Sequence, residues 1–270
     1  MKILQMNFTT SSKRPQVLSK YTVMRMERNT KKVLGYDVDL LSFDNAVNKT
    51  MDCISSASTL HIVTVNPEMI EMANTNKEFA EVLQNAGMVI PDGSGIKLAL
   101  KLKGINQEQI PGIDFTKRII ELCAKNGHKI ALIGAKEEVI QTAVQNLKNE
   151  YSDLQIAYFR NGYFNQDDEN EIIQAIAESG AKFVAVALGA PKQEFFIKKC
   201  IEKYPNAVYI GVGGSFDVWA GKVERAPKIF RMFGCEWLYR TLKQPERIKR
   251  VYKTLPIYLI KIIIEALQKK

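Results

Sequence analysis

The sequence has few of the residues on which metal sites and disulfide frameworks depend. Its 270 residues include four cysteines, which lie far apart with no paired spacing, and only two histidines, His61 and His128. Zinc sites and disulfide frameworks are recognised by closely spaced sets of such residues. The sequence therefore gives no zinc knuckle and no disulfide-stapled fold, and each histidine is expected to be a buried or half-buried polar residue.

Long hydrophobic runs are also missing. No stretch approaches the roughly 20 uninterrupted apolar residues that a membrane-spanning helix needs, and the longest late run, Ile257 to Ile264, is broken by Lys261. No apolar segment typical of a signal peptide follows Lys2. We therefore expect a cytoplasmic protein without a membrane span.

The net charge of +9 is unevenly distributed. Residues 222–270 carry 13 Lys and Arg against 4 Asp and Glu, residues 1–34 carry 8 against 1, and residues 35–221 carry 17 against 24. An acidic body with two basic ends differs from a nucleic-acid module with one uniform basic face. This distribution predicts a domain whose ends meet an anionic surface such as a membrane, and no nucleic-acid partner.

From about residue 34, short apolar runs alternate with longer amphipathic ones. This alternation predicts an α/β fold with a Rossmann-like, mostly parallel sheet and helices on both faces. The run 183–188 has no polar residue, as expected for a strand buried on both sides. The predicted strands are Leu60–Val65, Met88–Ile90, Lys129–Ile133, Gln155–Phe159, Phe183–Leu188 and Ala207–Val212. The predicted helices are Ile70–Asn85, Gly93–Leu102, Phe115–Asn126, Glu137–Tyr151, Glu169–Ser179 and Lys192–Tyr204.

The composition predicts that the chain is divided into three segments. They are a basic N-terminal arm (1–32), an α/β domain (33–222) and a basic helical C-terminal appendage (223–270). Pro245 and Pro256 are expected to break helices in the appendage. Basic and aromatic residues there interleave with apolar ones, which is typical of an amphipathic helix at a membrane surface. A solvated helix docked on its own domain explains Trp237 and Tyr239 nearly as well.

Four polar clusters follow predicted strands, and ligands of open parallel sheets bind at the carboxyl ends of the strands. In the first two clusters, helix capping accounts for Asn66 and Asp92. It does not account for Thr64, nor for Gly93 and Gly95, which weaken a first helical turn. Asp92 is therefore the first candidate for a general base. The clusters are Thr64–Glu68, Pro91–Gly95, Gly189–Glu194 and Gly211–Asp217.

The other two clusters favour a phosphate or a sugar. Lys192 and Gln193 are placed to hold a diphosphate or a sugar, although a tight strand-to-helix turn alone explains the glycine and proline before them. Gly211, Gly213 and Gly214 can form a concavity of backbone N–H groups for phosphate. The spacing fits neither the dinucleotide fingerprint nor a P-loop.

At these clusters the chain resembles the WecG/TagA/CpsF glycosyltransferases (glycosyltransferase family 26), and it is most similar to the TagA-type N-acetylmannosaminyltransferases. The resemblance runs from about residue 33 to 252. The segments that carry it are Thr64–Glu68, Pro91–Gly93, Pro111–Asp114, Gly189–Glu194, Gly211–Asp217, Gly221, Arg225–Pro227 and Glu236–Arg240.

The resemblance implies an inverting glycosyltransferase associated peripherally with the inner face of the cell membrane. Such enzymes move a sugar from a UDP-sugar to an undecaprenyl-diphosphate-linked sugar. The TagA branch adds N-acetylmannosamine to lipid-linked N-acetylglucosamine, the linkage-unit step of wall teichoic acid synthesis. An alternative is another UDP-sugar, such as that of N-acetylmannosaminuronic acid, glucose or galactose, in exopolysaccharide or capsule synthesis.

The resemblance also implies roles for individual residues. Asp92 corresponds to the proposed catalytic base, and Thr64, Asn66 and Gln193 line the pocket. The chain departs from many relatives at Gln109, where they carry an arginine. The remaining implied or expected substrate contacts are Lys192, Gly211, Gly213, Gly214, Asp217 and three arginines of the appendage, Arg240, Arg247 and Arg250.

We expect no cofactor and no metal. The one Asp-X-Asp motif noted, Asp37-Val38-Asp39, lies upstream of the strand ends, so the appendage arginines, the helix N-termini and Lys192 would stabilise the departing UDP. Two further classes remain open: a nucleotide-sugar epimerase or dehydrogenase, and a non-enzymatic membrane-surface or nucleic-acid binder. Self-association into a dimer or trimer would cover an exposed apolar face of the appendage.

Overall fold

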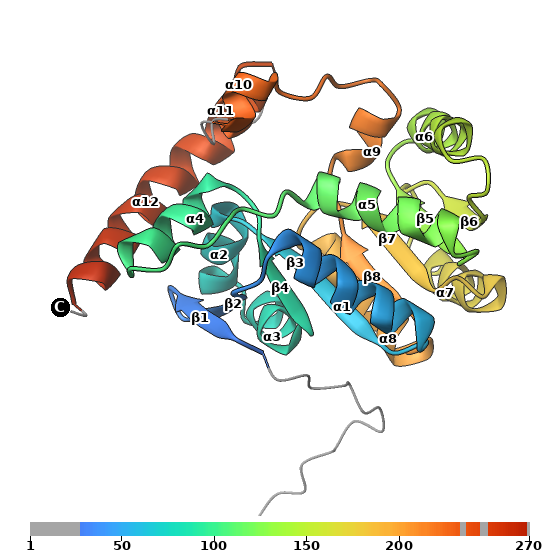
Figure 1. Ribbon diagram of the computed structural model, residues 1–270, viewed down its shortest axis with the longest axis horizontal. Helices are drawn as coiled ribbons and strands as arrows, with labels where there is room; N and C mark the ends of the chain where they lie inside the picture. The colour runs from blue at the N-terminus through green and yellow to red at the C-terminus, as the bar shows by residue number, and fades with distance from the viewer. Residues whose placement is uncertain (1–27, 233–235, 244–247, 269–270) are drawn as a thin grey trace, which may run out of the picture.

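The computed structural model describes residues 28–232, 236–243 and 248–268 (Figure 1). The described part contains a parallel sheet of six strands in the order β4-β3-β8-β7-β5-β6. The predicted α/β class and all six predicted strands are confirmed, with ends that shift by at most one residue. The strands are β3 (Leu60–Val65), β4 (Met88–Pro91), β5 (Ile130–Gly134), β6 (Ile156–Arg160), β7 (Phe183–Ala187) and β8 (Val208–Gly211).

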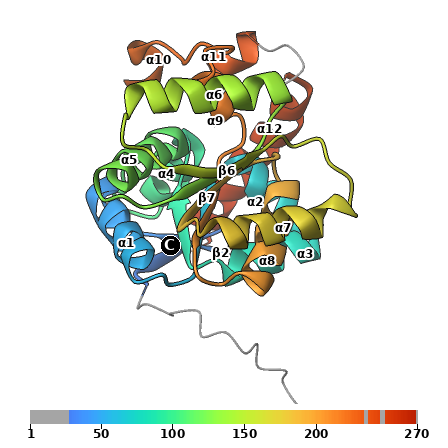
Figure 2. The same cartoon turned by 90° about the vertical axis from the view of Figure 1, so that its right-hand side faces the viewer.

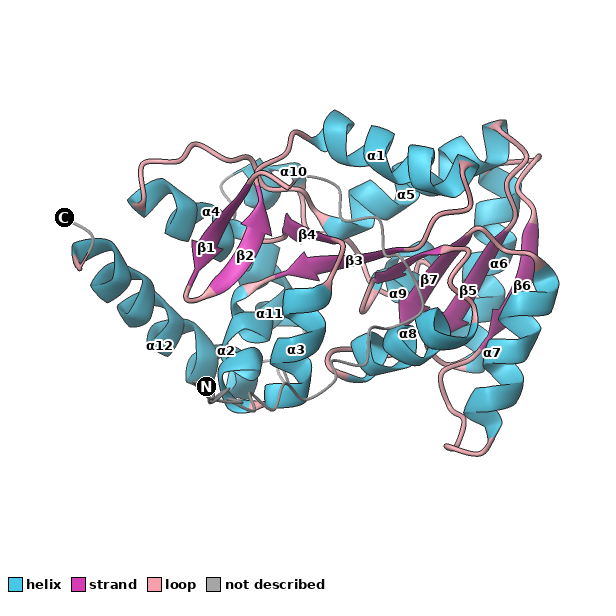
Figure 3. Cartoon of the chain, turned by 90° about the horizontal axis from the view of Figure 1, so that it is seen from below, coloured by secondary structure: helices cyan, strands magenta, loops and turns pink. Residues whose placement is uncertain are grey.

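Helices cover both faces of this sheet because the inner strands are apolar on both sides. Ile62 and Ala185 face one layer of helices, whereas Val63 and Val184 face the other. Figures 2 and 3 show α1 and α5 on one side and α7 and α8 on the opposite side. The first layer holds α1 (Phe43–Ser55), α5 (Gly112–Lys125), α6 (Glu137–Glu150) and α9 (Ser215–Trp219). The second holds α2 (Pro67–Thr75), α3 (Lys77–Asn85), α4 (Ser94–Leu102), α7 (Asp168–Ser179) and α8 (Lys192–Lys203).

Several elements differ from the sequence prediction. The single helix expected over Ile70–Asn85 is two helices, because the Asn76 side chain accepts a hydrogen bond from the Phe79 N–H (3.0 Å) and starts α3 anew. Helix α1 and the antiparallel hairpin of β1 (Thr30–Val33) and β2 (Tyr36–Asp39) were not predicted. Strand β1 spans the boundary drawn at residue 32, and most of the predicted arm lies outside the described residues.

Buried Asp39 attaches the hairpin to the sheet. Its carboxylate accepts hydrogen bonds from the Arg28 guanidinium (2.6 and 2.9 Å) and from the backbone N–H of Val89 in β4 (2.6 Å). Asp37 accepts a hydrogen bond from the Thr30 hydroxyl (3.1 Å). Both carboxylates of the Asp-X-Asp motif therefore stabilise the hairpin or its attachment to β4.

The appendage contains α10 (Lys228–Met232), α11 (Glu236–Lys243) and α12 (Ile248–Leu267), and α12 packs across α2 and α4 (Figure 1). Tyr258 and Ile262 are buried in the core of the body, and the Tyr258 hydroxyl donates a hydrogen bond to the Gly95 carbonyl (3.1 Å). The break expected at Pro256 is wrong, because this proline lies within α12. Packing of Tyr258 and Ile262 holds the helix in place just beyond it. Pro245 lies outside the described residues.

Two ion pairs hold α12 on the body. Lys261 pairs with Glu71 of α2 (2.5 Å), and Glu265 pairs with Lys103 (2.6 Å), whose side chain is only 3% exposed. The opposite face of α12 is apolar and open to solvent, with Ile257, Ile260, Ile263, Ile264 and Leu267 each at least 48% exposed. None of the helices in the described ranges combines the length and apolarity that crossing a membrane requires.

Candidate active site

The large cavity, of about 890 Å³, lies at the carboxyl ends of β3 and β4, between the body and the appendage. The first turns of α2, α4 and α5 form its floor, the segment 212–225 forms one wall, and α11 and α12 cover it. Helix first turns present backbone N–H groups without intrahelical partners, so this floor is electropositive. Of the sequence-predicted site residues, the structure brings Thr64, Asn66, Asp92 and Gly214 together in this cavity.

Asp92 directly follows β4, and its backbone N–H donates to the Val65 carbonyl (2.9 Å). The turn after it needs glycine, because Gly93 has a φ of +93°. A Cβ on Gly112, the first residue of α5, would lie 3.5 Å from Asp92 Oδ2 and 2.8 Å from Thr64 Cγ2. Glycine at 112 therefore lets α5 begin against the Asp92 carboxylate, where the helix dipole favours the ionised form.

Thr64 and Asn66 line the cavity while also having partners in the protein. The buried Thr64 hydroxyl donates to the Gly211 carbonyl (3.4 Å), which joins the ends of β3 and β8. Asn66 Oδ1 accepts from the Met69 N–H (3.1 Å) and caps α2. Packing explains the glycine at position 95, because a Cβ there would lie 2.4 Å from Pro67 Cγ.

Gln193 has its partners inside the protein. Its Oε1 accepts hydrogen bonds from the N–H groups of Gly189 (3.2 Å) and Gly213 (3.1 Å), and its Nε2 donates to Glu194 Oε1 (2.8 Å). It thereby joins the loops after β7 and β8. A Cβ on Gly211 would lie 2.3 Å from Gln193 Nε2, so glycine there serves packing.

The structure places the remaining predicted contacts away from the described cavity lining, or leaves their side chains undescribed. Lys192 is exposed at the start of α8, and Asp217 lies in α9. Neither residue lines the cavity, nor do Gln193, Gly211 and Gly213. Gln109 does line it. Arg240 and Arg250 lie on α11 and α12 without described side chains, and Arg247 lies outside the described residues.

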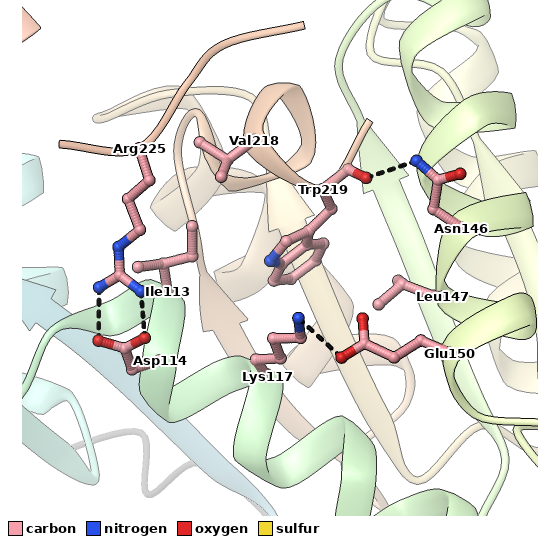
Figure 4. A pocket seen from close by; sticks show the side chains of 9 residues that line it. All are labelled: Ile113, Asp114, Lys117, Asn146, Leu147, Glu150, Val218, Trp219 and Arg225. Carbon is pink, nitrogen blue, oxygen red and sulfur yellow. Dashed lines mark hydrogen bonds and ion pairs between the residues drawn. The ribbon is translucent and has the colours of Figure 1, made fainter. Parts of the chain in front are cut away.

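Sequence reasoning did not single out an ion pair in the cavity wall. The Arg225 guanidinium donates two hydrogen bonds to the two carboxylate oxygens of Asp114, in the first turn of α5 (Figure 4). These hydrogen bonds raise the pKa of Arg225 above its ordinary value, partial burial acts the other way, and the charges of Asp114, Glu236 and Asp92 add to the rise. Both residues lie in motifs that carry the resemblance, but 111 positions separate them.

Arg225 also borders a second, smaller cavity of about 190 Å³ between α5, α6 and α9 (Figure 4). Lys117 pairs there with Glu150 (2.8 Å), and the Asn146 side chain donates to the Trp219 carbonyl (2.9 Å). The buried Trp219 Nε1 and Arg225 Nε atoms have no hydrogen-bond partner among the described residues.

The described wall of the large cavity is acidic. Within the described residues, only Lys97 and Arg225 are basic among those that line it. No three acidic, His or Cys side chains of the described ranges are grouped so that they could hold a metal ion. The acidic lining residues are Glu68, Asp92, Glu108, Asp114, Glu224 and Glu236.

Behind the glycine loop lies a carboxyl group that titrates near neutral pH. Burial raises the pKa of Glu194, which is only 1% exposed, from its usual 4.5 to about 7, and the hydrogen bond from Gln193 acts the other way. The other carboxyl oxygen, Oε2, has no described hydrogen-bond partner. Glu194 therefore carries its proton in the folded protein over a range in which the unfolded chain has lost it.

The stability should consequently fall as the pH rises from about 4.5 to about 7, because the unfolded state then binds fewer protons than the folded state. At about 1.4 kcal/mol per pKa unit, this contribution is on the order of 3 kcal/mol. Glu194→Gln should remove it, so that the variant gains stability relative to the wild type over this range in urea denaturation. Glu202→Gln, on the exposed side of α8, is the matched control. Equal changes in both variants would contradict the burial effect.

Comparison with known proteins identifies the family. The model of the Glycosyl transferase WecG/TagA/CpsF family matches residues 31–270. The chain is 35% identical over 239 residues to the N-acetylglucosaminyldiphosphoundecaprenol N-acetyl-beta-D-mannosaminyltransferase of Staphylococcus aureus, with 87% of this chain and 93% of that protein covered. A protein of the same name from Bacillus spizizenii is 35% identical over 228 residues, with 84% and 87% covered. The resemblance noted in the sequence is confirmed: the chain belongs to the WecG/TagA/CpsF family of glycosyl transferases.

Proposed function

We propose that the protein transfers N-acetylmannosamine from UDP-N-acetylmannosamine to undecaprenyl-diphosphate-linked N-acetylglucosamine, with inversion at the anomeric carbon. The observation that carries the proposal is the position of Asp92 in a cavity at the carboxyl edge of the sheet, in a chain whose relatives are named for this transfer. The product would be the linkage unit of wall teichoic acid, as the resemblance implies.

The reaction is a single displacement. The acceptor hydroxyl oxygen bonds to the anomeric carbon of the donor while the bond from that carbon to the diphosphate oxygen breaks, and UDP leaves with the bonding electrons. Ionised Asp92 accepts the hydroxyl proton as the oxygen attacks. Thr64 and Asn66 stand beside it at the end of β3, where their polar atoms can orient the sugars.

The diphosphate groups require positive charge, and the described wall supplies little of it. Among the described residues, six acidic and two basic side chains line this cavity. The further cations of this proposal come from the appendage, whose sequence includes Arg240, Arg247 and Arg250. In this arrangement the arginines and the N-termini of α2, α4 and α5 stabilise the departing UDP.

A peripheral position at the inner face of the membrane fits this arrangement. The open face of α12 is apolar, and the segment 222–270 has a charge of +9. Apolar side chains at the acyl boundary together with basic side chains near anionic headgroups give a helix affinity for a bilayer surface. Such binding would bring the lipid-linked acceptor to the mouth of the cavity.

Replacing the base should strongly lower turnover while donor binding persists. For Asp92→Asn we expect UDP release with lipid-linked N-acetylglucosamine to fall by about 10²–10⁴-fold, since this is the usual contribution of a general base. UDP affinity, measured by calorimetry, should change little. Asp153→Asn, an exposed site near the far end of the sheet, is the matched control.

The donor is identified in the same assay by comparing UDP-N-acetylmannosamine with UDP-N-acetylglucosamine and the other candidate UDP-sugars. Release of UDP from another donor only would support the proposed transferase activity but assign it a different donor sugar. Absence of any UDP binding would overturn the proposal.

Catalysis without a metal is a second expectation. The Asp39 carboxylate accepts hydrogen bonds from Arg28 and from the backbone N–H of Val89. The Asp37 carboxylate accepts one from the Thr30 hydroxyl. Both carboxylates of the Asp-X-Asp motif therefore already have partners within the protein. We expect turnover to be the same in excess EDTA as in added Mg²⁺. A loss of activity in EDTA that Mg²⁺ restores would contradict this expectation.

Charge on the open face of α12 should weaken membrane binding. For the double variant Ile260→Glu and Ile263→Glu, we expect at least a tenfold loss of cosedimentation with vesicles containing phosphatidylglycerol, because both side chains are at least half exposed and face away from the body. Phe159→Glu, at an exposed apolar site on the edge strand β6, is the control. Equal binding by the double variant and the control would exclude this face as the membrane contact.

A further inference from the structure

Arg225 lies where the two cavities and the segment leading to the appendage meet. It lines both cavities and stands between α9 and α10, in the stretch that joins the body to the appendage (Figure 1). Its guanidinium is turned toward α5, where the Asp114 carboxylate holds it by two parallel hydrogen bonds (Figure 4). A bidentate pair of this kind fixes both the position and the orientation of the positive charge.

This charge lines the same cavity as the proposed base. Asp114 is two residues from Gly112, whose Cβ position lies 3.5 Å from Asp92 Oδ2. Arg225 is also near enough for the Asp92 charge to add to the rise in its pKa. The attraction is mutual, so the guanidinium favours the ionised form of Asp92.

Most of the other charged side chains that the structure describes in this wall act in the opposite direction. Among the described lining residues, Lys97 of α4 is the one cation besides Arg225, and it is exposed. Carboxylates close to one another disfavour ionisation, so a wall without Arg225 would hold the proton on Asp92 to higher pH. The carboxylates come from every element around the cavity: Glu68 of α2, Glu108 before α5, Asp114 of α5, Glu224 beside Arg225 and Glu236 of α11.

We propose that Arg225 is a positioning residue whose positive charge favours the ionised form of Asp92, ready to accept the proton of the acceptor hydroxyl. The inference rests on the proposed role of Asp92 as general base. Arg225 acts through Asp92. Asp114 fixes the guanidinium against the start of α5, and its own negative charge partly offsets the effect of Arg225 on Asp92. The charge that sustains the base therefore belongs to the segment that leads into the appendage.

Two variants separate this role from a merely structural one. Arg225→Gln and Asp114→Asn break the same ion pair, but they change the charge beside Asp92 in opposite directions. In the pH dependence of kcat/KM, we expect the midpoint of the acidic limb to move to higher pH by about one unit in Arg225→Gln. In Asp114→Asn we expect this midpoint to move to lower pH. Arg225→Lys keeps the charge and should leave the limb near its wild-type position. Arg118→Gln, an exposed site on α5, is the matched control.

A second measurement needs no turnover. The titration of the Asp92 carboxyl carbon, followed by ¹³C NMR and assigned with Asp92→Asn, should shift in the same two directions. Movement of Asp92 in the same direction in both variants, or no movement in Arg225→Gln, would overturn the inference. An inactive wild type with opposite NMR shifts would overturn the proposed function and support the charge effect. If Arg225→Gln does not fold, Asp114→Asn and Arg225→Lys still decide, because an upward shift in either contradicts the inference.

Discussion

The geometry of the cavity depends on how closely the first turn of α5 approaches the end of β3. A Cβ on Gly112 would lie 2.8 Å from Thr64 Cγ2, a distance that would force the helix away from the sheet. The same close approach sets the start of α5 against Asp92 and places Asp114 where it can hold Arg225. One glycine therefore positions the proposed base, the helix dipole that favours its charge and the anchor of the nearby guanidinium.

Much of this arrangement could be predicted from sequence because parallel strands bring their carboxyl ends to one edge. The apolar runs located all six strands, and the motifs at the ends of β3, β4 and β8 located Thr64, Asn66, Asp92 and Gly214. Contacts between distant segments gave no such local signal. The Asp114–Arg225 pair joins positions 111 apart, and it is visible only once α5 and the segment after α9 are side by side.

The lack of a local signal for distant contacts also explains the features that differ from the sequence prediction. Strands β1 and β2 are short and polar, and the contact of Asp39 with Val89 and Arg28 is what attaches them to the sheet. Gln193 follows a glycine turn that suggests a ligand contact, but its amide is occupied by the loops after β7 and β8. Pro256 lies in a helix that tertiary packing of Tyr258 and Ile262 maintains. Each difference is a case in which tertiary contacts override local pattern.

The charge of the cavity explains why the appendage is built into the core. A wall with six acidic and two basic described side chains repels a diphosphate, so the proposed reaction needs cations brought by another element. Tyr258, Ile262 and two ion pairs hold α12 against α2 and α4, so that α11 and α12 cover the acidic wall. Helices α11 and α12 are thereby kept over the cavity, while the apolar open face of α12 stays exposed. In this scheme donor binding, the charge of Asp92 and contact with a membrane all depend on one docked helix and the segment that leads to it.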